Sequence, residues 1–361
     1  MNPRASAKAG TRLLLLGVWA LGGLARADQS PEQREPLRVR LGSLSRHELQ
    51  VLGLEEGLLR LRPSDSERGE IALRLEEASD LQFLLPASYQ EAQQLAYQHR
   101  PAEALEQLRP VIESLLPYLA APGTNAVSAV QTYLDLLLQQ REWLTAWALV
   151  ERLPGGLLSG PLGERLLPLA DGLRRAGEAG SAAALLTRLP LEERTDLVPA
   201  VETFAHGLRR LRHFAPAQVL YERLQPVDPP EARTDRALLI AYVLWHQGAT
   251  SEVSTCLAVL EEPPAETGAS TLYLLLQGLL ALERGDSSAA LDGLARALVT
   301  ATGGAEWRVE LQAVLAQAYA QAGRGALAAV LENDLRRLHP LSPWAPPAPS
   351  GPESEAPRPD A

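Results

Sequence analysis

Histidine is the side chain that most often binds metals or moves protons near neutral pH. The six in this chain are His47, His99, His206, His213, His246 and His339. No two are four residues apart, the spacing that lets two histidines on one helix share a metal ion, and no HExxH occurs. GxSxG, a Gly-rich phosphate loop and CxxC are also missing. The sequence therefore predicts no catalytic residues, no metal ligands and no cofactor.

The charge and the cysteine content exclude further classes of function. The chain of 361 residues has a formal net charge of −10, which makes it a poor candidate for binding nucleic acid or an anionic membrane surface. Cys256 is the only cysteine, so no internal disulfide can form. Its apolar neighbours Val253 and Leu257 favour a buried, inert thiol.

Residues 1–27 are typical of a secretory signal peptide. A basic start precedes the apolar run Leu13–Leu24, and Ala25-Arg26-Ala27 offers an A-x-A cleavage site. Cleavage there removes four basic residues and no acidic one, so the net charge goes from −10 to −14. We expect a periplasmic or secreted protein, with an uncleaved membrane anchor as the alternative. Residues 28–36 read as a disordered leader.

Residues 37–86 show a hydrophobic period of two, which predicts strands. About five short alternating runs occur, one apolar face opposing a face rich in arginine. The segment is similar to the SH3-like and Sm-like small barrels, which would close the sheet and remove its edges. A plain antiparallel sheet docked on the first helices is the alternative. In either case the arginines are interpreted as a solvated face.

From residue 87 to 339 the apolar residues follow a helical period, and turn residues recur at regular intervals. Residues 270–338 contain two copies of one helix–turn–helix unit, aligned on Gly285 and Gly323. A small residue precedes each of these glycines by seven positions, and an alanine follows by five. The same spacing marks further turns at His99, Arg141, Gly177, Arg212 and Gly248.

This pattern resembles the tetratricopeptide repeat (TPR), whose period is near 34 residues. The last six marks are 36, 35, 36, 37 and 38 residues apart. The resemblance implies a mainly α chain, with an α-solenoid of TPR-like helical hairpins over 87–339 that follows a small all-β domain over 37–86. Stacked hairpins bury their apolar faces against their neighbours.

In TPR arrays the first helix of each unit lines the concave groove, and the resemblance implies which residues face it here. On three consecutive units these are Arg174, Arg175, His206, Arg209, Arg210, Tyr242, Trp245 and His246. Arginine forks grip carboxylates, and Trp or Tyr anchor apolar side chains, so a ligand with acidic groups would suit this wall. In the last unit a neutral wall is expected, made of Glu310, Ala313, Gln317, Ala320 and Gln321. The alternative is that the arginines only solvate helix faces and that Trp245 belongs to the core.

Residues 340–361 hold eight prolines and are expected to form a disordered tail. Its PLSP and PWAP pieces are candidate polyproline ligands for another protein, with Trp344 as an anchor, and an inert tail is the alternative.

The leading hypothesis is a non-enzymatic, exported scaffold that binds a protein or peptide partner in the concave groove. The first alternative is an accessory module that binds a cell-wall polysaccharide or a peptidoglycan strand. An enzyme built on scattered carboxylates is the second alternative. Neither nucleic acid nor, after signal cleavage, an integral membrane segment is expected.

Overall fold

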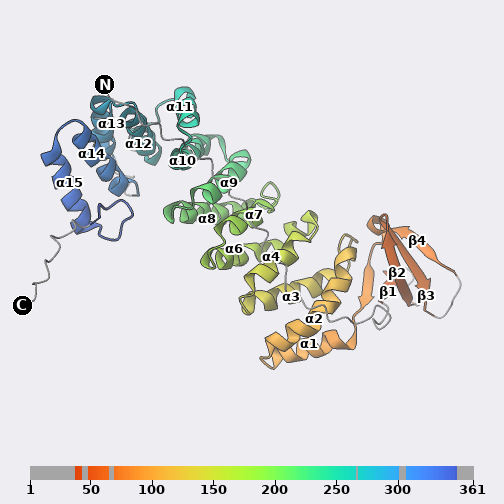
Figure 1. The fold of residues 1–361 in the computed structure, drawn as a ribbon. Helices are drawn as coiled ribbons and strands as arrows, with labels where there is room; N and C mark the ends of the chain where they lie inside the picture. Colours follow the sequence, from red (N-terminus) through yellow and green to blue (C-terminus); the bar gives the residue numbers. More distant parts are fainter. Residues whose placement is uncertain (1–36, 43–47, 65–68, 266, 301–305, 348–361) are drawn as a thin grey trace, which may run out of the picture.

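The computed structural model describes residues 37–42, 48–64, 69–265, 267–300 and 306–347. A curled sheet lies at one end of an elongated molecule, and an array of helices extends from it to the other end (Figure 1). The predicted signal peptide and leader, and residues 348–361 of the predicted tail, lie outside the described residues. Among the described residues, no helix combines the length and the apolar character needed to cross a membrane.

The described part of the sheet has five antiparallel strands in the order β4-β3-β2-β1-β5. They are β1 (Arg38–Leu41), β2 (Leu49–Glu55), β3 (Leu58–Pro63), β4 (Ile71–Arg74) and β5 (Leu81–Leu84). Alternation sets their burial, since Leu59 and Leu61 are fully buried while the arginines between and around them face outward. Arg60 and Arg62 pair with Glu70. The arginine face is therefore locally neutralised.

The sheet curls without closing. A two-residue turn at Glu56 and Gly57, both with positive φ (51° and 80°), joins β2 to β3. A register shift between Val51 and Gly53 bends β2, as bulges do. In the part described, no ladder joins β4 to β5, so the arrangement is the open sheet docked on helices.

The loop before α3 docks the sheet onto the helices through hydrogen bonds to β5 and to the residue before it. The Phe83 N–H donates to Asn125 Oδ1 (2.8 Å), and Asn125 Nδ2 donates to the Phe83 carbonyl (3.0 Å). The Asp80 N–H donates to the Pro122 carbonyl (3.1 Å). The β5 edge is thus hydrogen-bonded rather than exposed, and it fixes the start of the helical array.

The helices form seven antiparallel hairpins within the described residues. The first helices are α1 (Ala87–Tyr97), α3 (Ala126–Gln139), α6 (Leu166–Arg175), α8 (Val198–Arg210), α10 (Arg233–His246), α12 (Gly268–Glu283) and α14 (Arg308–Gln321). The second helices are α2 (Pro101–Leu115), α4 (Trp143–Glu151), α7 (Ala179–Thr187), α9 (Phe214–Leu224), α11 (Thr250–Val259), α13 (Ser287–Thr300) and α15 (Gly325–Leu338). A short helix, α5 (Pro161–Glu164), lies between α4 and α6.

Every hairpin turns in the same way, at the residue that the spacing marked. All seven marks have φ between 60° and 89°, whether or not they are glycine. At Gly177 the N–H donates to the Arg174 carbonyl (3.1 Å), and the next N–H, of Glu178, donates to the Leu173 carbonyl (2.9 Å). The same pair of bonds recurs at the other six marks. This is the Schellman ending of a helix, and it satisfies carbonyls that the helix leaves free.

The small residues lie where the paired helices come closest. The side chains five positions after the marks are all buried, namely Ala104, Ala146, Ala182, Ala217, Val253, Ala290 and Ala328. A Cβ built on Gly278 would lie 2.6 Å from the Leu294 side chain. The described chain is therefore a TPR-like α-solenoid with a small N-terminal all-β domain, as the sequence predicts.

Candidate functional site

The eight side chains expected in the groove lie on α6, α8 and α10, the first helices of three successive hairpins. Their surroundings differ sharply. Arg174 and Arg175 form ion pairs with Asp171 of their own helix (2.7 and 2.6 Å), away from the other six residues. The structure brings the α8 and α10 residues together instead.

Three of these residues meet the chain segment that begins α14. The cluster consists of Arg209, Tyr242, His246, Glu306, Trp307 and Glu310, and we call it the inner cluster. The Arg209 guanidinium lies over the Trp307 ring (4.3 Å to the centroid) and forms an ion pair with Glu306. Trp307 in turn packs edge-on against Tyr242 (4.8 Å between centroids). Residues three hairpins apart therefore touch.

The side chains of the inner cluster differ in how far they are exposed to a partner. Arg209 is only 5% exposed and Tyr242 only 2%, so neither side chain is accessible to a partner in this conformation. Arg210, beside them, keeps a 65% exposed side chain. We expected the Arg209 guanidinium to be free to bind an acidic ligand. In the structure it is buried and already forms an ion pair with Glu306 of the same chain.

Glu310 is the buried acceptor of the inner cluster. The Tyr242 hydroxyl donates to Glu310 Oε2 (2.7 Å), and His246 Nε2 lies 3.3 Å from Oε1. Burial, with a smaller contribution from the Glu310 carboxylate, raises the pKa of Tyr242, which keeps its hydroxyl a donor. The His246 ring also stacks on Phe214 (4.4 Å, 10° between planes).

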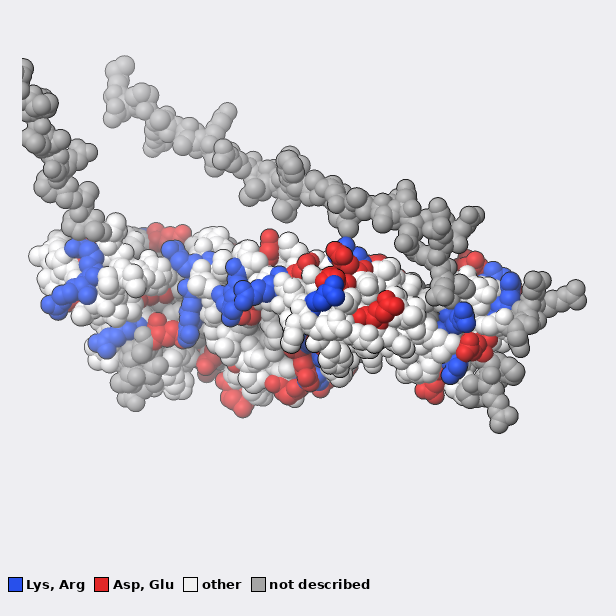
Figure 2. Space-filling model, turned by 90° about the horizontal axis from the view of Figure 1, so that it is seen from below, with Lys and Arg blue, Asp and Glu red and all other residues white. Residues whose placement is uncertain are grey.

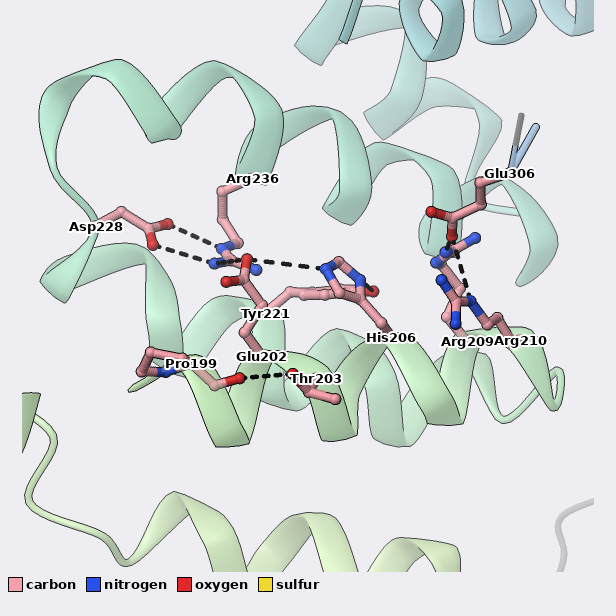
Figure 3. A network of polar contacts seen from close by, with 10 residues as sticks. All are labelled: Pro199, Glu202, Thr203, His206, Arg209, Arg210, Tyr221, Asp228, Arg236 and Glu306. Atoms are coloured by element: carbon pink, nitrogen blue, oxygen red, sulfur yellow. Dashed lines mark hydrogen bonds and ion pairs between the residues drawn. The ribbon is translucent and has the colours of Figure 1, made fainter. Parts of the chain in front are cut away.

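A second polar network, centred on Arg236, lies to one side of Arg209 and Glu306 (Figure 3). The buried Arg236 guanidinium donates through Nε and Nη2 to Asp228 (2.9 and 3.1 Å) and through Nη2 to Glu202 (2.7 Å). His206 Nδ1 lies 2.9 Å from the Tyr221 hydroxyl. Burial, supported by the Arg209 charge, lowers the pKa of His206 to about 4, so its imidazole is neutral at pH 7. Tyr221 is fully buried, so this network contributes to the packing between α8, α9 and α10.

A cavity of about 600 Å³ opens beside the inner cluster, between α10, α12 and α14; we call it the inner cavity. Trp245 and His246 line it from α10, and Trp344 lines it from the segment after α15. Trp344 also packs against His246 (5.4 Å between centroids), and the Arg212 guanidinium lies 5.2 Å from the Trp344 ring centroid. The candidate anchor in the tail therefore folds back onto the hairpin array.

The inner cavity is lined by some residues that were expected on the groove wall and by others that were not. Glu310, Ala313 and Gln317 of the last hairpin line it, as their repeat positions predict. Glu283, at the end of α12, also lines it. Glu306 and Trp307 gave no periodic signal, because they precede α14 and lie outside the repeated pattern.

Charges over the rest of the molecule are mixed. Figure 2 shows basic and acidic side chains interspersed along the face that it presents. Many arginines pair across neighbouring hairpins, such as Arg165 with Asp135 (2.6 Å) and Arg223 with Glu192 (2.6 Å). In the described part of the chain, no three His, Cys, Asp or Glu side chains gather as a metal site requires.

No family model matches the chain, and no curated protein matches it. Among solved structures, it is similar to a chain of the APC/C hetero-tetramer Cut9–Hcn1 (16% identity, TM-score 0.36), over 69% of this chain and 45% of that one. It is also similar to a chain of Naa15/Naa10 bound to HypK-THB (15%, 0.35), over 70% of this chain and 37% of that one. A tetratricopeptide repeat protein from Parabacteroides merdae ATCC 43184 aligns at 15% identity and a TM-score of 0.35, over 70% of this chain and 94% of its own. The chain thus spans less than half the length of the first two, and its TPR-like fold rests on the geometry of its own hairpins.

Proposed function

We propose that this protein is a non-enzymatic, exported scaffold that binds a protein or peptide partner on the inner face of its hairpin array. The observation that carries the proposal is the inner cavity. It is built by the first helices of three successive hairpins, and its volume of about 600 Å³ is in the range of sites that hold a few side chains or a small ligand. Tryptophans at such positions are frequent anchors of binding energy.

The exported location rests on the sequence of residues 1–27, which supports a periplasmic or secreted protein. A partner with acidic groups is not part of the proposal. Arg174 and Arg209, expected to hold such groups, already pair with Asp171 and Glu306 of the same chain.

A wall polysaccharide or peptidoglycan strand is the second candidate ligand. The observation in its favour is that two tryptophans, Trp245 and Trp344, line one cavity, where they could serve as flat platforms. It ranks second because only these two tryptophans line the described part of the cavity, whereas its apolar side chains, carboxylates and amides from α12 and α14 suit a peptide.

The test is capture from a native envelope extract by the immobilised mature chain beginning at Asp28. The variant is Trp245→Ala, and the matched control is Val259→Ala, an exposed apolar residue on the second helix of the same hairpin. Circular dichroism must first show equal helicity for all three proteins. We expect one protein to be retained by the parent and the control and lost by Trp245→Ala. Retention by all three would place binding away from the inner cavity, and co-sedimentation with purified wall polymer instead of protein capture would favour the second candidate.

A further inference from the structure

The charges that line the inner cavity are of one sign. Its described lining includes two carboxylates, Glu283 and Glu310, and neither lysine nor arginine. Arg284 follows Glu283 in the chain, but its guanidinium bonds Ser254 Oγ (3.0 Å) and does not line the cavity. The end of α12 adds negative potential at the same place, because the carbonyl end of a helix carries a partial negative charge.

The deeper carboxylate lacks a full cationic partner among the described residues. Glu310 is 3% exposed, and a buried carboxylate is costly unless it is paired. Its neighbours are the neutral Tyr242 hydroxyl and His246. His246 Nε2 is buried, and it makes no hydrogen bond of good geometry in the described part of the chain. Glu310 nevertheless lines the cavity wall, so a ligand that fills the cavity can approach its carboxylate.

The outer carboxylate is also available. Glu283 is exposed at the last position of α12, and no ion pair or hydrogen bond joins its side chain to another described residue. The two glutamates thus offer acceptors at an exposed and a buried position of one cavity. The amides of Gln317 and Gln321 lie in the same lining and can accept further hydrogen bonds.

Aromatic faces complete the lining. Indole rings attract cations more strongly than other aromatic side chains do. The Trp344 ring already contacts one cation, because the Arg212 guanidinium lies 5.2 Å from its centroid. Trp245 also lines the cavity. Leu279, Leu282 and Val314 supply apolar contact for the carbon chain of a long basic side chain.

We propose that the inner cavity binds a basic side chain, arginine or lysine, of the partner, with Glu283 and Glu310 as its acceptors and Trp245 and Trp344 as its walls. This inference rests on the proposed function and names the chemistry of the ligand at the same site. An acidic side chain there would face two carboxylates and no cation, and a neutral one would leave the carboxylates unpaired.

The experiment titrates the mature chain with four capped tripeptides, acetyl-Gly-X-Gly-amide with X as Arg, Lys, Gln or Glu. Intrinsic tryptophan fluorescence and saturation-transfer NMR report binding. We expect dissociation constants on the order of 1 mM for the arginine or the lysine peptide, and at least about tenfold weaker binding of the glutamine and glutamate peptides. Which of the two basic peptides binds more tightly distinguishes a fork-like from a point-like cation.

Two variants locate the binding. Glu283→Gln removes the exposed charge without disturbing a described contact, and we expect it to weaken the basic peptides about fivefold. Glu261→Gln is the matched control, an exposed glutamate outside the cavity lining, and should leave binding unchanged. Equal binding of the arginine and glutamine peptides, or equal effects of the two variants, would overturn the inference.

The outcomes separate this inference from the proposed function. Capture of a protein that depends on Trp245, without charge discrimination among the tripeptides, leaves the scaffold in place and removes the basic-side-chain site. Charge discrimination among the tripeptides, without capture of any macromolecule, keeps the site and removes the scaffold.

Discussion

His206 illustrates how burial sets the behaviour of single residues in this protein. Its ring contacts the Tyr221 hydroxyl and lies near Glu202, Arg209, Arg210 and Arg236. The pKa of about 4 lies below the ordinary value of 6.5. Between pH 6.5 and 4 the unfolded chain therefore binds a proton at this residue that the folded chain does not, and stability falls as the pH falls through that window.

We predict that His206→Gln flattens this part of the pH dependence. The stabilisation present above pH 6.5 and lost toward pH 4 is on the order of 2–3 kcal/mol for a shift of this size, somewhat reduced because the side chain is 30% exposed. Urea unfolding at pH 7 and pH 4.5 measures it, with His213→Gln, an exposed histidine, as the control. If both variants keep the slope of the parent, His206 titrates normally in the folded chain.

At the residue scale, the sequence predicted the helix on which each expected residue lies better than it predicted the burial and contacts of its side chain. Repeat position placed the expected residues on first helices, because side-chain direction follows helical period. The burial of Arg209 was not predictable, since it depends on Trp307, which lies 98 residues later in the chain. A local sequence pattern cannot predict a contact between residues so far apart in the chain.

The turn is the element that repeats most faithfully. Arg141 holds φ at 60° in a position where glycine has no steric cost, whereas a side chain costs about 1 kcal/mol. We predict that Arg141→Gly raises the free energy of unfolding by about 1 kcal/mol and that Arg141→Ala does not. Thermal and urea unfolding of the three proteins measure the difference. Equal stability of the glycine and alanine variants would mean that the turn does not limit this hairpin.

A glycine inside a helix can be required for a different reason, the close packing of a neighbouring helix. Gly278 on α12 has Leu294 where a Cβ would lie, so Gly278→Ala should lower the free energy of unfolding by about 1–3 kcal/mol. Gly180 on α7 has open space at that point, and Gly180→Ala should raise it by about 0.5–1 kcal/mol. Opposite signs in parallel denaturant curves are the expected result, and a gain from both substitutions would show that α12 and α13 can separate at little cost.

The strands and helical hairpins were predictable because the sequence patterns that indicate them are local. The period of two located the strands, and the spacing of glycine, alanine and proline located the hairpins, including the turns at His99, Arg141 and Arg212 that lack glycine. Whether the sheet closes depends on contacts between its two edge strands, and the period of two leaves that open. The hydrogen bonds of Asn125 to β5 show how this edge is protected without closure.

At the scale of the whole molecule, the inner cluster spans the last four hairpins, from α8 to α14. Trp307 is 6% exposed and contacts both Arg209 on α8 and Tyr242 on α10. It therefore joins hairpins that are not neighbours in the array. A solenoid without such contacts is held only by adjacent units.

We predict that Trp307→Ala opens this half of the array. Loss of a buried tryptophan costs about 3–5 kcal/mol of stability, and small-angle X-ray scattering should show a larger radius of gyration at unchanged helicity. Trp147→Ala is the control, because Trp147 is a partly buried tryptophan on α4, outside the inner cluster, and should change stability without changing shape. An unchanged scattering curve for Trp307→Ala would assign the curvature to contacts between adjacent hairpins alone.

The contact between Arg209 and Trp307 also restricts how such a chain can change in length during evolution. Repeat arrays grow and shrink by duplication or loss of whole units. A unit inserted between α8 and α14 would carry Trp307 away from Arg209, whereas one inserted between α3 and α7 would leave both partners in register. Relatives that retain this pair are therefore expected to differ in unit number on the sheet side of α8 and to inherit the hairpins from α8 to α14 as one block.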